Sequence, residues 1–227
     1  IYQGAACSEA DVMIIEIGGT TGDIESQPFL EAIRQIALEV GHENCLFLHV
    51  TLVPYLKGSG EHKSKPTQHS VKELRAMGIS PNIIIARADE PLDGGIKAKI
   101  SLFCNVKPDC VIENLTVPCL YEVPILLHEH GLDAVVCREL SLKAPDPDLG
   151  EWKAMNARIA ARKGQVTVAI VGKYVKLHDA YLSIIESLNH ASFDVGVNVN
   201  LRWIDSEAIE CRGAEALLDG VDAIIVP

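Results

Sequence analysis

An acidic, glycine-rich segment between Glu16 and Glu25 carries the residue types in this chain that are best suited to bind a ligand. It reads Glu-Ile-Gly-Gly-Thr-Thr-Gly-Asp-Ile-Glu and follows the apolar run Val12–Ile15. Three glycines within five residues let the backbone approach a ligand closely. Glu16, Asp23 and Glu25 would repel a bare phosphate, but they can bind a hard cation or accept hydrogen bonds from hydroxyl and amino groups. The segment therefore predicts a site for a Mg²⁺-bound nucleotide or for the hydroxyl groups of a sugar.

A second segment, between Gly58 and Gln68, has the opposite character. It reads Gly-Ser-Gly-Glu-His-Lys-Ser-Lys-Pro-Thr-Gln and follows another apolar run. Lys63 and Lys65 can pair with an anion, and Pro66 favours the first turn of a helix whose free N–H groups can also meet an anion. Together the two segments suit a ligand with one anionic end and one hydroxyl- or amine-bearing end, such as a nucleoside triphosphate.

Apolar runs alternate along the first part of the chain with amphipathic helical patterns, which is typical of an α/β fold with a parallel sheet. The carboxyl ends of parallel strands share one edge of the sheet, so both segments are expected there. Phe29, Ile33 and Ala37 share one face of the first expected helix and are expected to lie in the core. The expected strands span residues 12–15, 46–53, 83–86 and 135–137, and the expected helices span residues 28–40, 67–77, 96–103 and 123–130.

A break at residues 141–149, with two prolines and alternating aspartates, cannot continue a central strand or helix. We therefore expect a first domain over residues 1–140, a linker with a helix over 141–164, and a second α/β domain over 165–227. The second domain is expected to contain strands at 165–171, 197–203 and 223–226 and a helix at 179–191. So few strands are marginal alone, and the first residue is Ile1, so we expect an internal segment of a longer protein.

The composition excludes several classes of partner. The net charge of −11 argues against nucleic acid or an anionic membrane, and no apolar stretch reaches the roughly 18 residues that span a bilayer. Seven cysteines are an odd number and form no Cys-x-x-Cys pair, so we expect reduced thiols and no zinc site. The protein is expected in the cytoplasm, and no histidine is assigned a catalytic role.

The two segments also resemble the signature loops of the CTP synthase family, over Glu16–Ser26 and Lys63–Leu74. The likeness continues in the family's order at Pro28–Gln35, Leu102–Val106 and Asp222–Pro227. The resemblance implies a parallel-sheet, P-loop-type amidoligase domain, incomplete here, followed by the start of a flavodoxin-like class I glutamine amidotransferase domain. In that family ATP phosphorylates the uracil 4-oxygen of UTP, and ammonia from glutamine displaces the phosphate to give CTP. The phosphate loop and the nucleophilic cysteine would lie outside this chain, so the segment is expected to be inactive alone and to hold no catalytic residue.

The resemblance also implies roles for individual residues. Glu16 would be a Mg²⁺ ligand. CTP would act as a feedback inhibitor, GTP as an activator, and the protein would form a homotetramer. The UTP-binding residues would be Lys63, Ser64, Lys65, Pro66, Thr67, Gln68 and Lys99; the CTP-binding residues would be Asp23, Ile24 and Glu25 with Lys63, Lys65, Gln68 and Lys99; and the ATP-binding residues would be Leu115, Thr116, Val117 and Arg87.

Two other functions remain open from the residues alone. One is a different Mg²⁺–ATP-dependent ligase of the same group, such as a dethiobiotin or cobyrinate amide synthetase. The other is a module that binds UTP or CTP without catalysis. Simpler roles also compete residue by residue, since Glu16 could pair with a lysine, Lys63 and Lys65 could lie on a solvated loop, and Asp23 could complement a helix dipole.

Overall fold

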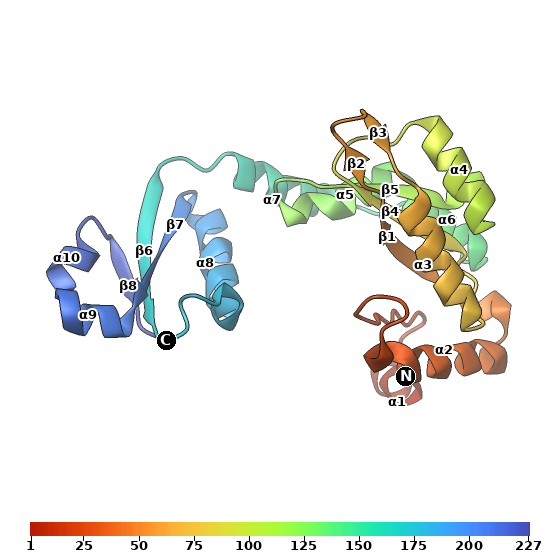
Figure 1. The fold of residues 1–227 in the computed structure, drawn as a ribbon, viewed down its shortest axis with the longest axis horizontal. Coiled ribbons are helices and arrows are strands. Elements are labelled where there is room, and N and C mark those ends of the chain that lie inside the picture. The colour runs from red at the N-terminus through yellow and green to blue at the C-terminus, as the bar shows by residue number, and fades with distance from the viewer. The chain divides into compact units, whose positions relative to one another are not determined.

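The computed structural model describes residues 1–227, and the chain divides into two units (Figure 1). Unit 1 runs from Ile1 to Asp146 and unit 2 from Pro147 to Pro227. The division falls inside the expected linker of residues 141–164. The two units are described separately. No helix in either of them is both long enough and apolar enough to cross a membrane.

A three-stranded parallel sheet forms the centre of unit 1. Its order is β1 (Leu48–Leu52), β4 (Ile83–Ala88) and β5 (Val111–Leu115), so β4 is the middle strand. A short antiparallel hairpin of β2 (Tyr55–Leu56) and β3 (Glu61–His62) follows β1. The helices of unit 1 are α1 (Tyr2–Ser8), α2 (Gln27–Val40), α3 (Lys65–Ala76), α4 (Gly94–Cys104), α5 (Val123–Glu129) and α6 (Leu132–Glu139), with 3₁₀ turns at Ile24–Ser26, His42–Asn44, Pro108–Cys110 and Leu120–Glu122.

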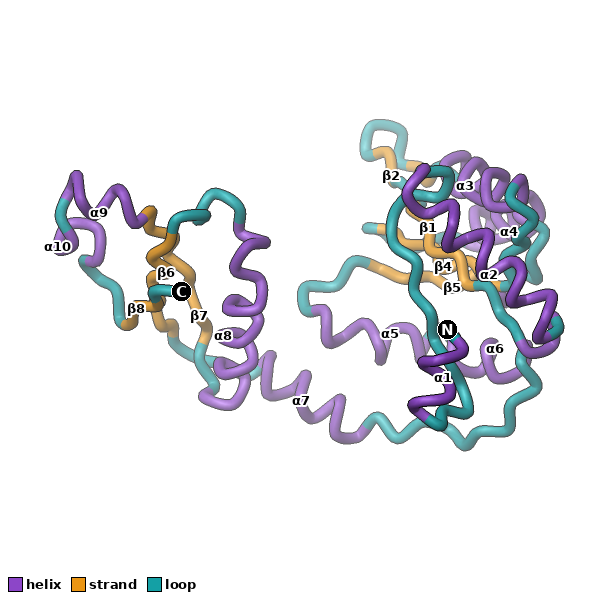
Figure 2. The backbone as a smooth tube through the Cα atoms, turned by 90° about the horizontal axis from the view of Figure 1, so that it is seen from below, coloured by secondary structure: helices purple, strands orange, loops and turns teal.

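Helices cover both faces of this sheet, with α3 and α4 on one side and α5 and α6 on the other (Figure 2). Successive residues of β4 point to opposite faces because side chains alternate along a strand. Ile84 packs with Ile100 of α4, whereas Ile83 and Ile85 pack with Val135 of α6. Such burial on both faces explains why β4 is a continuous apolar run.

Most of the elements expected in unit 1 are confirmed. The strands expected at residues 46–53 and 83–86 correspond to β1 and β4. The four expected helices correspond to α2, α3, α4 and α5, with ends that differ by a few residues. Pro66 lies in the first turn of α3, as its fixed φ favours.

The strand expected at Val12–Ile15 is wrong, because these residues form no regular structure. An apolar run becomes a strand only when it hydrogen-bonds to a neighbouring strand. β1 is an edge strand of the sheet and pairs only with β4, so no strand formed by residues 12–15 lies beside it. All four side chains are exposed, and Ile14 is 91% exposed. Phe29 was also expected in the core but is 63% exposed, while Leu30 beside it is buried.

The strand expected at Val135–Cys137 is wrong as well, since these residues lie within α6. Three apolar residues are too few to separate a strand from a buried helical turn. Leu132, Val135 and Val136 have helical spacing and pack against the sheet. The third strand is instead β5, which is not a continuous apolar run because Glu113 and Asn114 interrupt it.

Unit 2 is built on a second parallel sheet, of order β7 (Asn198–Asp205), β6 (Gln165–Gly172) and β8 (Ala223–Ile225). The three strands expected in this part of the chain are confirmed. Ala169 and Val171 of β6 and Ile204 of β7 form its buried cluster. The helices of unit 2 are α7 (Gly150–Ala160), α8 (Leu182–Val195), α9 (Ser206–Arg212) and α10 (Ala214–Leu218), with a 3₁₀ turn at His178–Tyr181.

Candidate functional site

Three parts of the expected nucleotide site follow the three strands of unit 1 at their carboxyl ends. The basic segment comes after β1, Arg87 lies near the end of β4, and Leu115 ends β5. The register of the sheet pairs Arg87 with Asn114 and Ala88 with Leu115. Because the strands are parallel, all three parts lie at one edge of the sheet, where open α/β sheets bind ligands.

The start of α3 is fixed to β1 by buried hydroxyl groups. Thr67 is fully buried, and its Oγ1 lies 3.0 Å from Thr51 Oγ1 and 3.2 Å from the carbonyl oxygen of Leu52. Ser64 is also buried, and its Oγ accepts a hydrogen bond of 2.9 Å from Gln68 Nε2. The side chains of Thr67 and Ser64 therefore hold the segment in place, and Gln68 retains its carbonyl oxygen as an acceptor.

One of the expected UTP-binding lysines is paired with a carboxylate. Lys63 donates a hydrogen bond to Glu61, whereas Lys99 lies in the middle of α4. The hydrogen bond from Lys63 is the main reason why the pKa of Glu61 is below its usual range; Ser59 and the charge of Lys99 add to the effect. Lys65 and Pro66 are exposed at the first turn of α3. The structure thus concentrates positive charge at this end of the helix.

The expected ATP-binding residues meet at the ends of β4 and β5. Thr116 donates its backbone N–H to the carbonyl oxygen of Ala88 at 3.0 Å and its hydroxyl to Asp89 at 2.8 Å. Arg87 is exposed beside them, and Val117 follows directly. The loop after β4 therefore connects Arg87 to the segment from Leu115 to Val117.

The loop after β4 is held by Glu113, a buried residue that the sequence analysis did not identify. Glu113 is 7% exposed and accepts a hydrogen bond of 2.5 Å from the backbone N–H of Leu92. Its carboxylate lies 3.7 Å from Lys97 Nζ and 3.6 Å from His130 Nε2. The signal in the sequence was a charged residue directly after the apolar stretch Cys110–Ile112. A carboxylate that is buried there needs partners such as Lys97 and His130.

The acidic segment adopts an irregular loop that Gly19 and Gly22 make possible, with φ angles of 90° and 103°. Asp23 stabilises its turn, because its Oδ2 accepts the backbone N–H of Thr20 at 3.2 Å. Ile17 packs in a cluster with Leu74, near the carboxyl end of α3. The structure therefore does not bring the acidic segment beside the lysines, which lie at the other end of α3.

Glu16 and Glu25 both line a cavity of about 630 Å³ in unit 1. Its wall is otherwise mainly apolar. No group of three or more His, Cys, Asp or Glu side chains that could surround a metal ion occurs in the structure. Mg²⁺ commonly takes only one or two carboxylates and completes its shell with water and phosphate oxygens. The donor set therefore fits Mg²⁺ held together with a nucleotide. The remaining lining residues are Ile1, Tyr2, Ile15, Ile17, Gly18, Ser26, Phe29, Ala32, Ile33 and Ile36.

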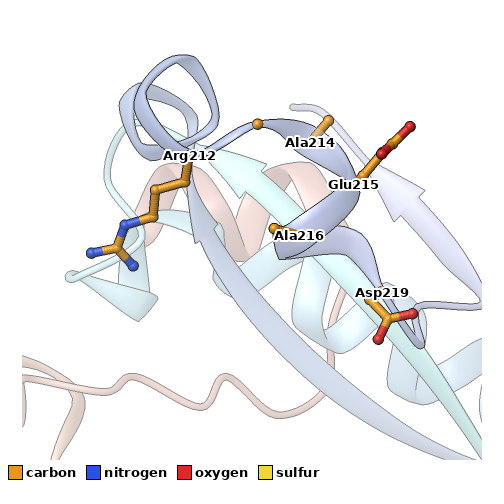
Figure 3. Close-up of a pocket in the computed structure, with 6 residues that line it drawn as sticks. Arg212, Ala214, Glu215, Ala216 and Asp219 are labelled. Atoms are coloured by element: carbon orange, nitrogen blue, oxygen red, sulfur yellow. The ribbon is translucent and has the colours of Figure 1, made fainter.

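A cavity of about 710 Å³ in unit 2 lies beside α9 and α10. Figure 3 shows the side chains of Arg212, Glu215 and Asp219 pointing in different directions around it. A binding site requires polar groups that converge on one ligand. This cavity therefore contributes nothing to the candidate site.

Comparison with known proteins gives a consistent result. Residues 1–142 match the family model for the CTP synthase N-terminus. The chain is 52% identical to the CTP synthase of Clostridium acetobutylicum and 54% identical to that of Clostridium beijerinckii, each over 227 residues, which are 100% of this chain and 42% of the relative. It is 54% identical over 217 residues to the CTP synthase of Synechococcus sp., covering 96% of this chain and 40% of the relative. The chain thus spans less than half the length of these relatives.

Proposed function

Because the chain belongs to the CTP synthase family, we propose that it takes part in the ATP-dependent amination of UTP to CTP with ammonia derived from glutamine. The observation that carries this proposal to particular residues is the ion pair between Lys63 and Glu61, because it shows that the ammonium group of Lys63 meets an anionic group beside the start of α3. An ammonium group in this place suits a ligand that carries several negative charges close together. The triphosphate of UTP is such a ligand.

Lys63 and Lys99 would neutralise the triphosphate, and the first turn of α3 would add backbone N–H groups. Gln68 donates its amide to Ser64, which fixes its orientation, so its carbonyl oxygen can accept the N3–H of uracil. Ser64, Pro66 and Thr67 would act by holding the backbone, since Ser64 and Thr67 are buried. Lys65 would contribute charge from the exposed face of the helix.

ATP would bind at the ends of β4 and β5. Arg87 presents a guanidinium group, which matches phosphate geometry. The segment from Leu115 to Val117 would contact adenine through its backbone, because Thr116 already uses its hydroxyl and N–H within the protein. UTP and ATP would therefore meet across the loop that follows β4.

Mg²⁺ would be held by Glu16, with Glu25 on the same cavity wall. The ion, when bound, would offset the charge of the phosphates. Asp23, Ile24 and Glu25 would contact CTP as a feedback inhibitor, since carboxylates accept hydrogen bonds from ribose hydroxyls and from the cytosine amine.

Residues 1–140 would belong to the synthetase domain, and residues 165–227, after the linker at 141–164, to the start of a glutamine amidotransferase domain. The order β7-β6-β8 supports the second assignment, because the flavodoxin-like order also places the first strand between the second and the third. A cytoplasmic homotetramer with GTP as activator is part of the same proposal.

The test is steady-state kinetics of the intact protein, with ammonia in place of glutamine so that only the synthetase reaction is measured. Lys99→Met should raise the KM for UTP at least about tenfold, because it removes one of two charges that meet the triphosphate. Arg87→Met should instead raise the KM for ATP. Lys72→Met, on the exposed face of α3, is the matched control and should change neither constant.

The assignment fails if Lys99→Met leaves the KM for UTP at the value of the control variant. It also fails if the unmodified protein forms no CTP from UTP, ATP and ammonia. A protein that binds UTP but turns over none would support the non-catalytic module instead.

A further inference from the structure

Glu61 is the charged residue closest to the candidate triphosphate site to which the proposed function gives no role. Its carboxylate accepts a hydrogen bond from the ammonium group of Lys63. Its side chain is about half exposed, as is that of Lys63. The carboxylate therefore occupies the place where Lys63 would meet an anion.

The backbone holds this carboxylate in position. Glu61 pairs with Leu56 in the β2–β3 hairpin, whose turn is closed by a hydrogen bond of 2.8 Å from the N–H of Gly60 to the carbonyl oxygen of Leu56. Directly after the hairpin, the N–H of Lys63 donates to the carbonyl oxygen of Pro54 at 2.9 Å. The carboxylate thus stays close to Lys63 at a high effective concentration.

We propose that Glu61 is an internal counter-ion of the candidate triphosphate site, and that a nucleotide must displace it from Lys63 in order to bind. This inference rests on the proposed function, because it takes Lys63 as a ligand of the triphosphate. A nucleotide gains only the difference between its own attraction to Lys63 and that of Glu61. Each nucleotide that displaces Glu61 loses the same amount of free energy, so UMP, which binds Lys63 with the fewest charges, retains the least net attraction.

The direction of the effect separates this role from a structural one. Glu61→Gln keeps the size of the side chain and an acceptor oxygen, but it removes the charge that competes for Lys63. We expect UTP to bind about two- to fivefold more tightly, the factor for one partly exposed ion pair. UMP and UDP should gain by the same factor, because each of them must displace the same carboxylate.

The experiment is calorimetric titration of the intact protein with UTP, UDP and UMP, at low and at moderate salt and with and without Mg²⁺. Glu73→Gln is the matched control, because it removes the same charge from the exposed face of α3. Its affinities should equal those of the unmodified protein. The gain from Glu61→Gln should shrink as salt is added, since salt screens the competing charge.

Two further variants, Lys63→Met and Lys99→Met, separate failure of the inference from failure of the proposed function. If they weaken UTP binding but Glu61→Gln binds UTP no more tightly, the counter-ion role alone is overturned. Weaker binding by Glu61→Gln only in the presence of Mg²⁺ would also overturn it, because the carboxylate would then be a metal ligand. If neither lysine variant weakens UTP binding, both the site assignment and the inference fall.

Discussion

Replacement of Glu113 tests whether a buried carboxylate holds the loop between the two candidate nucleotide sites. Glu113 accepts the N–H of Leu92 at 2.5 Å and faces Lys97 at 3.7 Å, and its side chain is 8% exposed. Glutamine keeps an acceptor but loses the charge. A hydrogen bond to a charged group contributes about 1 kcal/mol more than a neutral one, and the pair with the partly exposed Lys97 adds up to about 1 kcal/mol. We therefore expect Glu113→Gln to cost about 1–2 kcal/mol.

Glu113→Ala should cost more, about 3–5 kcal/mol, because it removes the acceptor as well and leaves Lys97 and His130 without their buried partner. The assay is native-state hydrogen exchange of the intact protein, followed by mass spectrometry of a peptide that contains Leu92. Exchange becomes about tenfold faster for each 1.4 kcal/mol lost from the local opening free energy. Glu113→Gln should therefore speed exchange by about five- to thirtyfold, and Glu113→Ala by more than about a hundredfold.

The matched control is Glu129→Gln, at the exposed end of α5, which should leave this exchange unchanged. The reasoning would be refuted if Glu113→Ala exchanged at the rate of the control, since the Leu92 amide would then be protected by something else. Equal rates in the two Glu113 variants would refute the charge argument alone.

Three other substitutions test single contacts in the same way. Thr67→Val should lower the stability of unit 1 by about 1–3 kcal/mol in urea denaturation. Thr51→Val should cost less in a protein that already carries Thr67→Val than it costs in the unmodified protein, because it then removes a buried hydroxyl that has lost its partner. His49 is buried, which lowers its pKa from 6.5, so stability should fall as the pH drops below 6.5; His49→Gln should remove that part of the pH dependence. Gly172→Ala would place a Cβ against the hydroxyl group of Tyr181 and should cost about 1–3 kcal/mol by thermal denaturation; the cost should be smaller in a protein that also carries Tyr181→Ala.

The elements that the sequence predicted correctly are those whose apolar pattern is long or fully buried. β4 shows this best, because Ile83, Ile84 and Ile85 face two different cores. Val12–Ile15 has a similar composition but forms no strand, since pairing depends on a neighbour that a local pattern does not reveal. The opposite case is β5, which forms a strand although Glu113 interrupts its apolar run. Tertiary partners make this charged residue acceptable inside a sheet.

The candidate site shows the same limit at the level of single side chains. Sequence reasoning selected Thr67 together with Lys63, yet Thr67 is fully buried against β1 and only the lysine can meet a ligand through its side chain. The position of Lys99 depends on where α4 begins. Asp93 sets that point, since its Oδ1 accepts the N–H of Ile96 at 2.8 Å, while Glu113 fixes the preceding loop. Residue types thus indicate the chemistry, but a helix cap and a buried carboxylate decide where those residues lie.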